Sequence, residues 1–593
     1  MSKLLTLLAL LFATPLLFAS VQDHDRRGSP FDGLRWKDGR PEVQVGDDWY
    51  RPVAIHGTKV EAILEHCGKR WPGQTEKRFG EDLVEAMVGM GVEVPKEVDL
   101  ELVRLSDGKS VTLEGVEMSL AKRNAIRNAS RGGSRPRRPS PPATLSREQA
   151  RADVAQFRER LEDQFAYLHT RDVDVAGDLE RLAQELGEEV ATADLCDRMH
   201  RILMRCGDGH ARVQSEHLER PDAYPPVLLV EAEGGVVALR PDRSGFLDAK
   251  RPFVVKIDGR KLAEWVDDLS PWIAAGSPQL VRERALRAMR EIVSWRQRLG
   301  LPVAETVTYE LAARPTARSG KKLEVELGGR RPTYGSWPRG ETRRLEGDLG
   351  YLRLARMDDD LIPDLRRAMA GFEDTRGLVV DVRGNGGGSR GLLIALAGYL
   401  TGVDEGAWVG NVAAYRLSDL FREDHLRARF MVRPEEMPAK SAGREAIDAL
   451  ARTFRPEWDP GQGFSPWHYL VLGPTGADGE YFYDKPVVVL SDAGCFSATD
   501  IFLGALKGRP RVTLMGAASG GGSARSQGFR LAHSGIEVRC ASMASFRTDG
   551  RLYDGRGVEV DLEVEPAAGD LLEGGGDLVL ERAVEHLKGG RSR

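Results

Sequence analysis

The chain has 593 residues, of which 30% are charged, and its 85 basic and 90 acidic residues leave a net charge of −5. A chain of this length exceeds what a single hydrophobic core supports, so we expect several domains. Nothing in this charge balance provides the basic excess that nucleic-acid binding requires, and we expect no nucleic-acid partner. The five cysteines have no close Cys-x-x-Cys spacing, which indicates neither a disulfide scaffold nor a zinc site.

The first twenty residues have the pattern of a secretory signal peptide. Lys3 supplies the positive start, an apolar run covers residues 4–18, and Ala19 is the small residue of a cleavage site. The run is short for a membrane span and Pro15 interrupts it, so we expect no stable membrane insertion after cleavage. The mature chain is therefore expected to be secreted or periplasmic.

The next segments differ sharply in composition. Residues 21–128 alternate strand-like and helix-like pieces and predict an accessory α/β domain of unknown role, while the Pro- and Arg-rich residues 129–145 predict an extended linker. A helical unit is expected over residues 146–219, starting with capping-box spacing between Ser146 and Gln149.

A histidine follows the last helix of this unit. The helix predicted over 193–206 ends at Gly207, and Asp208-Gly209-His210 comes directly after it. Backbone that turns tightly holds His210, although an ordinary loop histidine is the alternative. Residues 220–335 then predict a β-rich, peptide-binding type of module that contains a long helical stretch over 280–299.

From residue 336 the pattern becomes α/β, with an irregular insertion at 401–484. The buried strand predicted at 377–382 ends in the glycine-rich loop 383–388. Backbone N–H groups of such a loop can hold a phosphate or an oxyanion, but its glycine spacing matches neither a P-loop nor a dinucleotide-binding fingerprint. A plain strand-to-helix turn is the structural alternative. Near the end of the chain, the segments 535–540 and 543–547 predict the two strands of a hairpin-like return.

A second strand, turn and helix surround Ser497. Residues 486–490 are apolar and β-branched, residues 491–494 have turn chemistry, and helical spacing follows. This arrangement places Ser497 at a helix N-terminus, where free N–H groups and the helix dipole favour a developing negative charge. A simple helix cap is the alternative for an isolated serine. Cys495 is a rival nucleophile, which we interpret as a packing or disulfide residue.

Several motifs occur together in one order. They are CGDGHA at 206–211, DVRGNGGG at 381–388, VVVLSDAGCFSATD at 487–500, LMGAASGGG at 514–522 and DGRGVEVDLEV at 554–564. In this combination the sequence resembles the C-terminal-processing serine peptidases, also called tail-specific proteases, over about residues 147–590. The resemblance implies a ClpP- or crotonase-like αβ catalytic core over 336–593, a helical cap over 146–219 and a PDZ-like module over 220–335.

The resemblance also implies which residues act. One branch of the family uses a lysine in the glycine-rich loop after the serine, but the corresponding position here is about Gly522, and Lys507 lies in the wrong segment. The tricorn-type branch uses a histidine of the GDGH-like segment and a carboxylate near the closing motif. That arrangement corresponds to His210, Ser497 and Asp554.

Two departures from the tricorn-type pattern are visible. The family often has glutamate where this chain has Asp554, and the residue before the histidine, which can be serine, is Gly209 here. The chemistry still agrees, because a hydrogen-bonded imidazole can remove the proton of a serine hydroxyl and a carboxylate can fix the imidazole tautomer. His533 is a rival base, in a predicted strand-connecting turn.

We therefore expect an exported serine peptidase that cleaves polypeptides, with an oxyanion hole formed by the N–H groups of Gly386 or Gly387 and of Ala498. No metal or organic cofactor is needed, and the chain can be an oligomer. A catalytically silent relative that binds a peptide or a hydrophobic ligand is the alternative. An esterase that uses the same three residues is a third hypothesis.

Overall fold

The computed structural model describes residues 28–70, 75–92, 94–132, 140–418 and 424–589. The chain divides into two compact units, residues 1–138 and 139–593. The predicted signal peptide at 1–20 and part of the predicted linker lie outside the described residues. Among the helices of the described ranges, none is long and apolar enough to cross a membrane.

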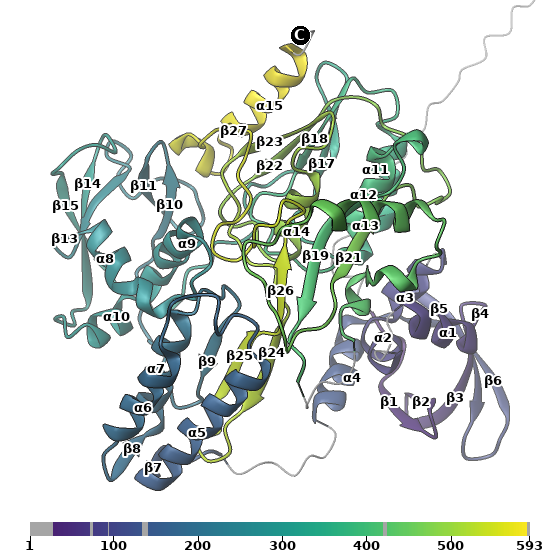
Figure 1. The fold of residues 1–593 in the computed structure, drawn as a ribbon, viewed down its shortest axis with the longest axis horizontal. Helices are drawn as coiled ribbons and strands as arrows, with labels where there is room; N and C mark the ends of the chain where they lie inside the picture. Colours follow the sequence, from purple (N-terminus) through teal and green to yellow (C-terminus); the bar gives the residue numbers. More distant parts are fainter. Residues whose placement is uncertain (1–27, 71–74, 93, 133–139, 419–423, 590–593) are drawn as a thin grey trace, which may run out of the picture. The chain divides into compact units, whose positions relative to one another are not determined.

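The first unit is an antiparallel sheet packed against helices (Figure 1). Buried and exposed residues alternate along β3 and β5, so one face of the sheet packs on a core that includes Phe79 and Met87. The elements are β1 (Gly33–Lys37), β2 (Arg40–Val45), β3 (Asp48–Ile55), β4 (Thr58–Lys59), α1 (Val60–Arg70), α2 (Thr75–Glu81), α3 (Leu83–Gly89), β5 (Glu97–Arg104), β6 (Ser110–Glu117) and α4 (Leu120–Gly132).

The second unit begins with a helical part. It consists of β7 (Thr144–Ser146), α5 (Arg147–Gln164), α6 (Val175–Gln184), β8 (Glu189–Ala191) and α7 (Thr192–Met204). The predicted capping box is confirmed, because the N–H of Gln149 donates to Ser146 Oγ and the N–H of Ser146 donates to Gln149 Oε1. The extended linker predicted at 129–145 is shorter in the structure, since α4 continues to Gly132 and Thr144 already pairs with Ala191.

A separate antiparallel sheet, in the order β10-β11-β12-β14-β15, forms the β-rich module. The helical stretch predicted over 280–299 is present but is not one continuous α-helix, because α9 ends at Ala288, a 3-10 turn covers Met289–Glu291 and α10 begins at Ile292. The indole N–H of Trp295 donates to the Ala288 carbonyl oxygen, which a continuing helix would have used. The elements are β10 (Leu228–Ala232), β11 (Gly235–Leu239), β12 (Phe253–Ile257), β13 (Arg260–Lys261), α8 (Leu262–Leu269), α9 (Pro278–Ala288), α10 (Ile292–Arg298), β14 (Thr306–Ala312) and β15 (Lys321–Glu326).

The core of the second unit is a mainly parallel sheet in the order β16-β17-β18-β22-β23-β27. Every residue of β18 and β22 is buried, as the apolar runs predict, and the two strands are parallel neighbours. Helices α11, α12 and α14 pack on one face and α15 on the other. The elements are β16 (Arg343–Leu345), β17 (Leu349–Arg353), α11 (Ile362–Ala370), β18 (Gly377–Asp381), α12 (Gly391–Leu400), β22 (Val487–Ser491), α14 (Ala498–Leu506), β23 (Val512–Gly516), β27 (Leu562–Glu563) and α15 (Leu578–Gly589).

Two smaller sheets complete the unit, in the orders β20-β21-β19-β26 and β24-β25-β9. Residues 401–484 are therefore not irregular, because they supply β19, β20, β21 and α13. The predicted hairpin of β25 with β26 is also wrong, since the two strands join different sheets. The elements are β9 (Arg212–Gln214), β19 (Trp408–Tyr415), β20 (Met431–Val432), α13 (Ala442–Thr453), β21 (His468–Leu472), β24 (Ser526–Arg530), β25 (Glu537–Ala541) and β26 (Met543–Phe546).

Candidate active site

Ser497 lies at a tight turn between β22 and α14. Its backbone has φ 63° and ψ −117°, which a residue with a side chain rarely adopts. A conformation of this kind costs on the order of 1–3 kcal/mol and persists where the surrounding structure enforces it. The turn lifts the half-buried serine away from the strand and leaves the N–H of Ala498 at the first helical position, where amides have no intrahelical partner.

His210 reaches this serine from the helical part. Its Nε2 lies 3.3 Å from Ser497 Oγ. Gly207, with φ 77°, turns the chain after α7, and the backbone N–H of His210 donates to Asp208 Oδ1 at 2.8 Å. Strand β9 follows two residues later and pairs with β25. Local turn chemistry and a sheet pairing together bring His210 to the serine.

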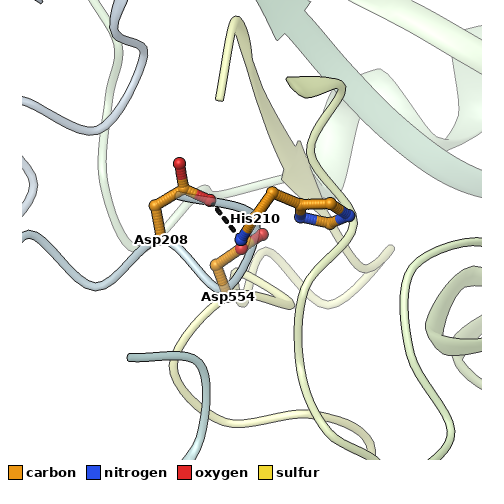
Figure 2. A group of neighbouring side chains, drawn as sticks. All are labelled: Asp208, His210 and Asp554. Carbon is orange, nitrogen blue, oxygen red and sulfur yellow. Dashed lines mark hydrogen bonds between the residues drawn. The ribbon is translucent and has the colours of Figure 1, made fainter. Parts of the chain in front are cut away.

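Asp554 lies beside His210 without a hydrogen bond to its ring. Asp554 Oδ2 accepts from the Tyr167 hydroxyl at 2.8 Å and from the Ser523 N–H at 3.1 Å. Asp554 Oδ1 and His210 Nδ1 are both buried and have no partner among the described residues. Figure 2 shows Asp208 bonded to the backbone nitrogen of His210, whereas the imidazole ring extends away from Asp208.

Asp208, His210 and Asp554 also have the spacing of a cation site, since one ligand-type atom of each lies within 4.8 Å of the others. However, Asp208 Oδ1 accepts from the His210 N–H and its Oδ2 accepts from the Ala541 N–H at 2.7 Å. Both oxygens of this carboxylate thus hold the histidine loop against β25. The bonds give Asp208 a positioning role.

Burial determines the protonation states of His210, Asp208 and Asp554. It lowers the pKa of His210 to about 3, and the charges of Arg284 and Arg429 act in the same direction. Burial raises the pKa of Asp208 to about 6 and that of Asp554 to about 8, and the negative charge of Asp208 adds to the second shift. At neutral pH His210 is therefore a neutral imidazole, which is the form that accepts a proton.

The glycine-rich loop lies against the serine turn because β18 and β22 are neighbours. A Cβ placed on Gly387 would lie 2.7 Å from Ser497 Cβ and 2.9 Å from the Ala498 nitrogen. The N–H of Gly387 already donates to Asn385 Oδ1 at 3.0 Å. Within the described residues, the N–H groups of Gly386 and Ala498 have no acceptor. The amide of Ala498, directly after the serine, is consequently an open donor at this turn.

Phe496 fills the space between the serine turn, the histidine and the second glycine-rich loop. Its ring centroid is 4.5 Å from that of His210. A Cβ on Gly209 would meet the Phe496 ring at 2.9 Å, and a Cβ on Gly522 would meet it at 2.2 Å. The ring therefore leaves little room for a side chain at Gly522, where the resemblance places the lysine of the other branch, or at Gly209 before His210.

We expect Gly522→Lys to destabilise the second unit by about 1–3 kcal/mol, because the new side chain overlaps the Phe496 ring. Thermal unfolding followed by circular dichroism measures this loss. In a Phe496→Ala background the same lysine should cost much less. Gly245→Lys is the matched control, since a Cβ there meets nothing within 4 Å. Equal losses with and without the Phe496 ring would contradict the overlap.

Sequence reasoning missed several side chains that hold the site. Asp500 accepts from the N–H groups of Gly521 and Gly522 at 3.0 Å each, and Arg284 Nη1 donates to the Gly209 carbonyl oxygen at 2.8 Å. For Asp500 a signal exists, because Ser-x-x-Asp has capping-box spacing. Arg284, on α9, and the Tyr167 hydroxyl have no local signal, because their partners are far away in sequence.

The rival residues lie outside this arrangement. His533 is exposed in the turn between β24 and β25, and Lys507 pairs with Asp561 at the end of α14. Cys495 is a buried free thiol that donates to the Val382 carbonyl oxygen, and burial raises its pKa. All five cysteines are buried free thiols, so the structure contains no bond that would support a disulfide role for Cys495.

A serine at a strained strand-to-helix turn, facing a neutral imidazole and flanked by glycine amides, defines the class of serine hydrolases. Residues 348–564 match the profile of peptidase family S41, and this match supports a serine-type peptidase. No curated protein sequence matches the chain.

Solved structures resemble this chain at low sequence identity, and the two CPAF structures among them share its fold. A point mutant of CPAF is 15% identical, with a TM-score of 0.52 over 74% of this chain and 96% of that chain. Mature CPAF complexed with lactacystin is also 15% identical, with a TM-score of 0.50 over 75% of this chain and 97% of that chain. A peptidase structure from Parabacteroides merdae is 17% identical, covers 76% of this chain and 100% of that chain, and has a TM-score of 0.41.

Proposed function

We propose that the chain is an exported peptidase that hydrolyses polypeptides with Ser497 as nucleophile, His210 as base and Asp554 as the partner of the imidazole. The 3.3 Å approach of His210 Nε2 to Ser497 Oγ carries this proposal. The two residues are 287 positions apart in sequence, so their meeting is a property of the tertiary fold. A nucleophile and a base within hydrogen-bond reach are what acyl transfer requires.

In the proposed reaction, His210 Nε2 takes the hydroxyl proton while Ser497 Oγ forms a bond to the scissile carbonyl carbon. The proton then passes to the departing amine as the C–N bond breaks, which leaves an acyl-enzyme. Water releases the acyl group by the same steps in reverse order, with His210 again as the base. The neutral imidazole that burial favours is ready for the first step.

Backbone amides beside the serine stabilise the negative charge that forms on the substrate's carbonyl oxygen. We assign Ala498 and Gly386 as the donors that are open in this structure, and Gly387 as a donor once its bond to Asn385 is released. The positive end of α14 adds to this stabilisation.

Asp554 serves the base in this scheme. For Nε2 to accept a proton, Nδ1 must carry one, and the unpartnered Asp554 Oδ1 is the nearby acceptor for that N–H. Tyr167 and Ser523 hold the other oxygen and thereby fix the carboxylate. Catalytic hydrogen bonds are often long before substrate binds, so the open gap is compatible with this role.

A cavity of about 790 Å³ lies between the β-rich module and the residues that precede Ser497, and neither Ser497 nor His210 is among the residues that line it. The edge strand β10 and helix α9 line one part of it, and Gly384 and residues 492–494 line another. An open strand edge can accept a peptide as an added strand. We propose that this module is PDZ-like and takes up substrate chain ends here. The Tyr334 hydroxyl now bonds both the N–H and the carbonyl oxygen of Leu229, so an incoming peptide has to displace it.

A fluorophosphonate probe tests the nucleophile directly, because it labels only activated serines. We expect the purified mature chain to be labelled, and both Ser497→Ala and His210→Ala to lose labelling. If labelling is lost in Ser497→Ala but not in His210→Ala, Ser497 remains the nucleophile and another residue is the base, with His533 as the first candidate. A folded wild type that is not labelled would favour the binding-module alternative. Peptide and simple ester substrates, compared on the labelled protein, separate a peptidase from an esterase.

A further inference from the structure

Helix α9 of the β-rich module forms hydrogen bonds to two loops of the catalytic core. The hydroxyl of Ser277, which caps the N-terminus of α9, donates to the Gly520 carbonyl oxygen at 2.7 Å. Gln279 Nε2 donates to the carbonyl oxygen of Ser519 at 2.7 Å and to that of Arg556 at 2.8 Å. The module therefore holds the glycine-rich loop after β23 and the closing segment of the core through side chains of one helix turn.

Arg284, further along α9, reaches the loop that carries the histidine. Its Nη1 donates to the Gly209 carbonyl oxygen at 2.8 Å and to the Ala274 carbonyl oxygen at 3.2 Å. Its guanidinium carbon lies 4.8 Å from the centre of the Phe496 ring, and the centre of that ring is 4.5 Å from the centre of the His210 ring. The guanidinium group thus contacts both the peptide group before the histidine and the aromatic ring beside its imidazole.

The other two arginines of α9 have different partners. Arg282 forms a salt bridge with Glu231, and Arg287 forms one with Glu283. Arg284 forms no salt bridge with a described residue, and its Nη1 bonds go to backbone carbonyl oxygens. A charged donor on a backbone carbonyl group fixes the position of a loop more firmly than a neutral donor does. This difference indicates that Arg284 serves the histidine loop.

We propose that Arg284 and Gln279 are positioning residues of the proposed active site. Arg284 acts on the imidazole of His210, through the carbonyl group before it and the aromatic ring beside it. Gln279 acts on the carboxylate of Asp554, through the carbonyl group two residues later. The β-rich module is then part of the catalytic structure and not only a surface for peptides. This inference rests on the proposed function, because both residues act through groups to which that function assigns a role.

Arg284→Met tests the first contact, because methionine keeps an extended apolar side chain and removes the charge and the donors. We expect kcat on a fluorogenic peptide to fall about 10- to 100-fold, since a shift of about 1 Å in a catalytic group can cost 10²-fold. KM should stay within about threefold. The rate of fluorophosphonate labelling should fall by a similar factor, because labelling depends on the serine and its base and not on peptide uptake. Arg284→Lys, which keeps the charge and one donor group, should recover part of both losses.

Gln279→Ala tests the second contact. It removes two hydrogen bonds to backbone carbonyl groups, and we expect kcat to fall about 3- to 10-fold with little change in KM. Arg260→Met is the matched control for the arginine, because Arg260 belongs to the same module and lies 5.0 Å from the centre of the Trp265 ring. Arg260 pairs with Asp268 and contacts no catalytic loop, so kcat and KM should stay within about twofold of the wild type.

A spectroscopic measurement tests the same contact without turnover. In protein labelled with ¹³C at the histidine Cε1 atoms, the signal of His210 is the one that His210→Gln lacks. The nearby Phe496 ring should displace this signal upfield, and Arg284→Met should move it towards the position of a free histidine. Arg260→Met should leave it in place, and the signal of the exposed His533 should not move in either variant.

The outcomes separate this inference from the proposed function. A labelled wild type in which Arg284→Met changes neither kcat nor the His210 signal, or changes only KM, would retain the hydrolytic function and overturn the positioning role. A wild type that is never labelled, but whose His210 signal moves in Arg284→Met and not in Arg260→Met, would support the positioning role and overturn the catalytic one. Thermal unfolding shows whether Arg284→Met folds. If it does not, Gln279→Ala decides, and a kcat within twofold of the wild type in that variant would overturn the inference.

Discussion

Replacing His210 by alanine is expected to lower kcat/KM for peptide hydrolysis by about 10⁶-fold while the chain stays folded. The reason is that Nε2 of this residue is the base atom at 3.3 Å from Ser497 Oγ. Loss of the base leaves only the backbone amides and substrate binding, which account for a small residual rate in serine hydrolases. Initial rates on a fluorogenic peptide, with active sites counted by fluorophosphonate titration of the wild type, measure the change.

His533→Ala is the matched control for this experiment. His533 is exposed in the turn between β24 and β25, so its removal should leave kcat/KM within about twofold of the wild type. Thermal unfolding of His210→Ala should show a transition like that of the wild type, which separates loss of the base from loss of the fold. Full activity in His210→Ala, together with inactive His533→Ala, would contradict the assignment.

The sequence predicts correctly those elements that depend on local residue patterns or on known motifs. The buried strands β18 and β22 and the capping box at Ser146 follow from residue patterns, and the structure confirms them. The parallel pairing of β18 with β22 then explains why two distant loops meet at Ser497. The choice of His210 came from the resemblance to a peptidase family, because no spacing rule connects two residues that are 287 positions apart.

What the sequence did not reveal depends on long-range packing. Local strand patterns do not say which sheet a strand joins, so β25 and β26 were wrongly paired. Helical periodicity did not show that a Trp295 side chain replaces a helical bond after Ala288. The contact of the Phe496 ring with Gly522 is equally unpredictable from the sequence, because the position of the ring depends on three segments that meet only in the folded chain.

Replacing Asp554 by asparagine is expected to lower kcat by about 10⁴-fold. The substitution should also remove the rise of kcat/KM with pH that we expect of the wild type. Tyr167 and Ser523 both donate to Oδ2, so the amide oxygen of the asparagine should take that place and its NH₂ group should face His210. The NH₂ group would then donate to Nδ1, which places the imidazole proton on Nε2. A protonated Nε2 cannot accept the proton of Ser497.

The pH dependence of the wild type follows from the same carboxylate. Burial, with the charges of Asp208 and Asp500, raises the pKa of Asp554 to about 8. The carboxylate is protonated below this pH and ionised above it, and only the ionised form accepts the Nδ1 proton. We therefore expect kcat/KM to rise between about pH 7 and pH 9. The pKa of His210, about 3, lies too low to contribute in that range.

Asp208→Asn provides the control for this rise. It removes a negative charge that raises the pKa of Asp554, so the midpoint of the rise should move to lower pH, whereas in Asp554→Asn the rise should disappear. Initial rates at low substrate concentration between pH 5 and pH 10, in buffers of constant ionic strength, measure both effects. A fall in kcat/KM across pH 7–9 in the wild type, or an unchanged rise in Asp554→Asn, would mean that another group controls the base and that Asp554 only holds Tyr167 and Ser523 in place.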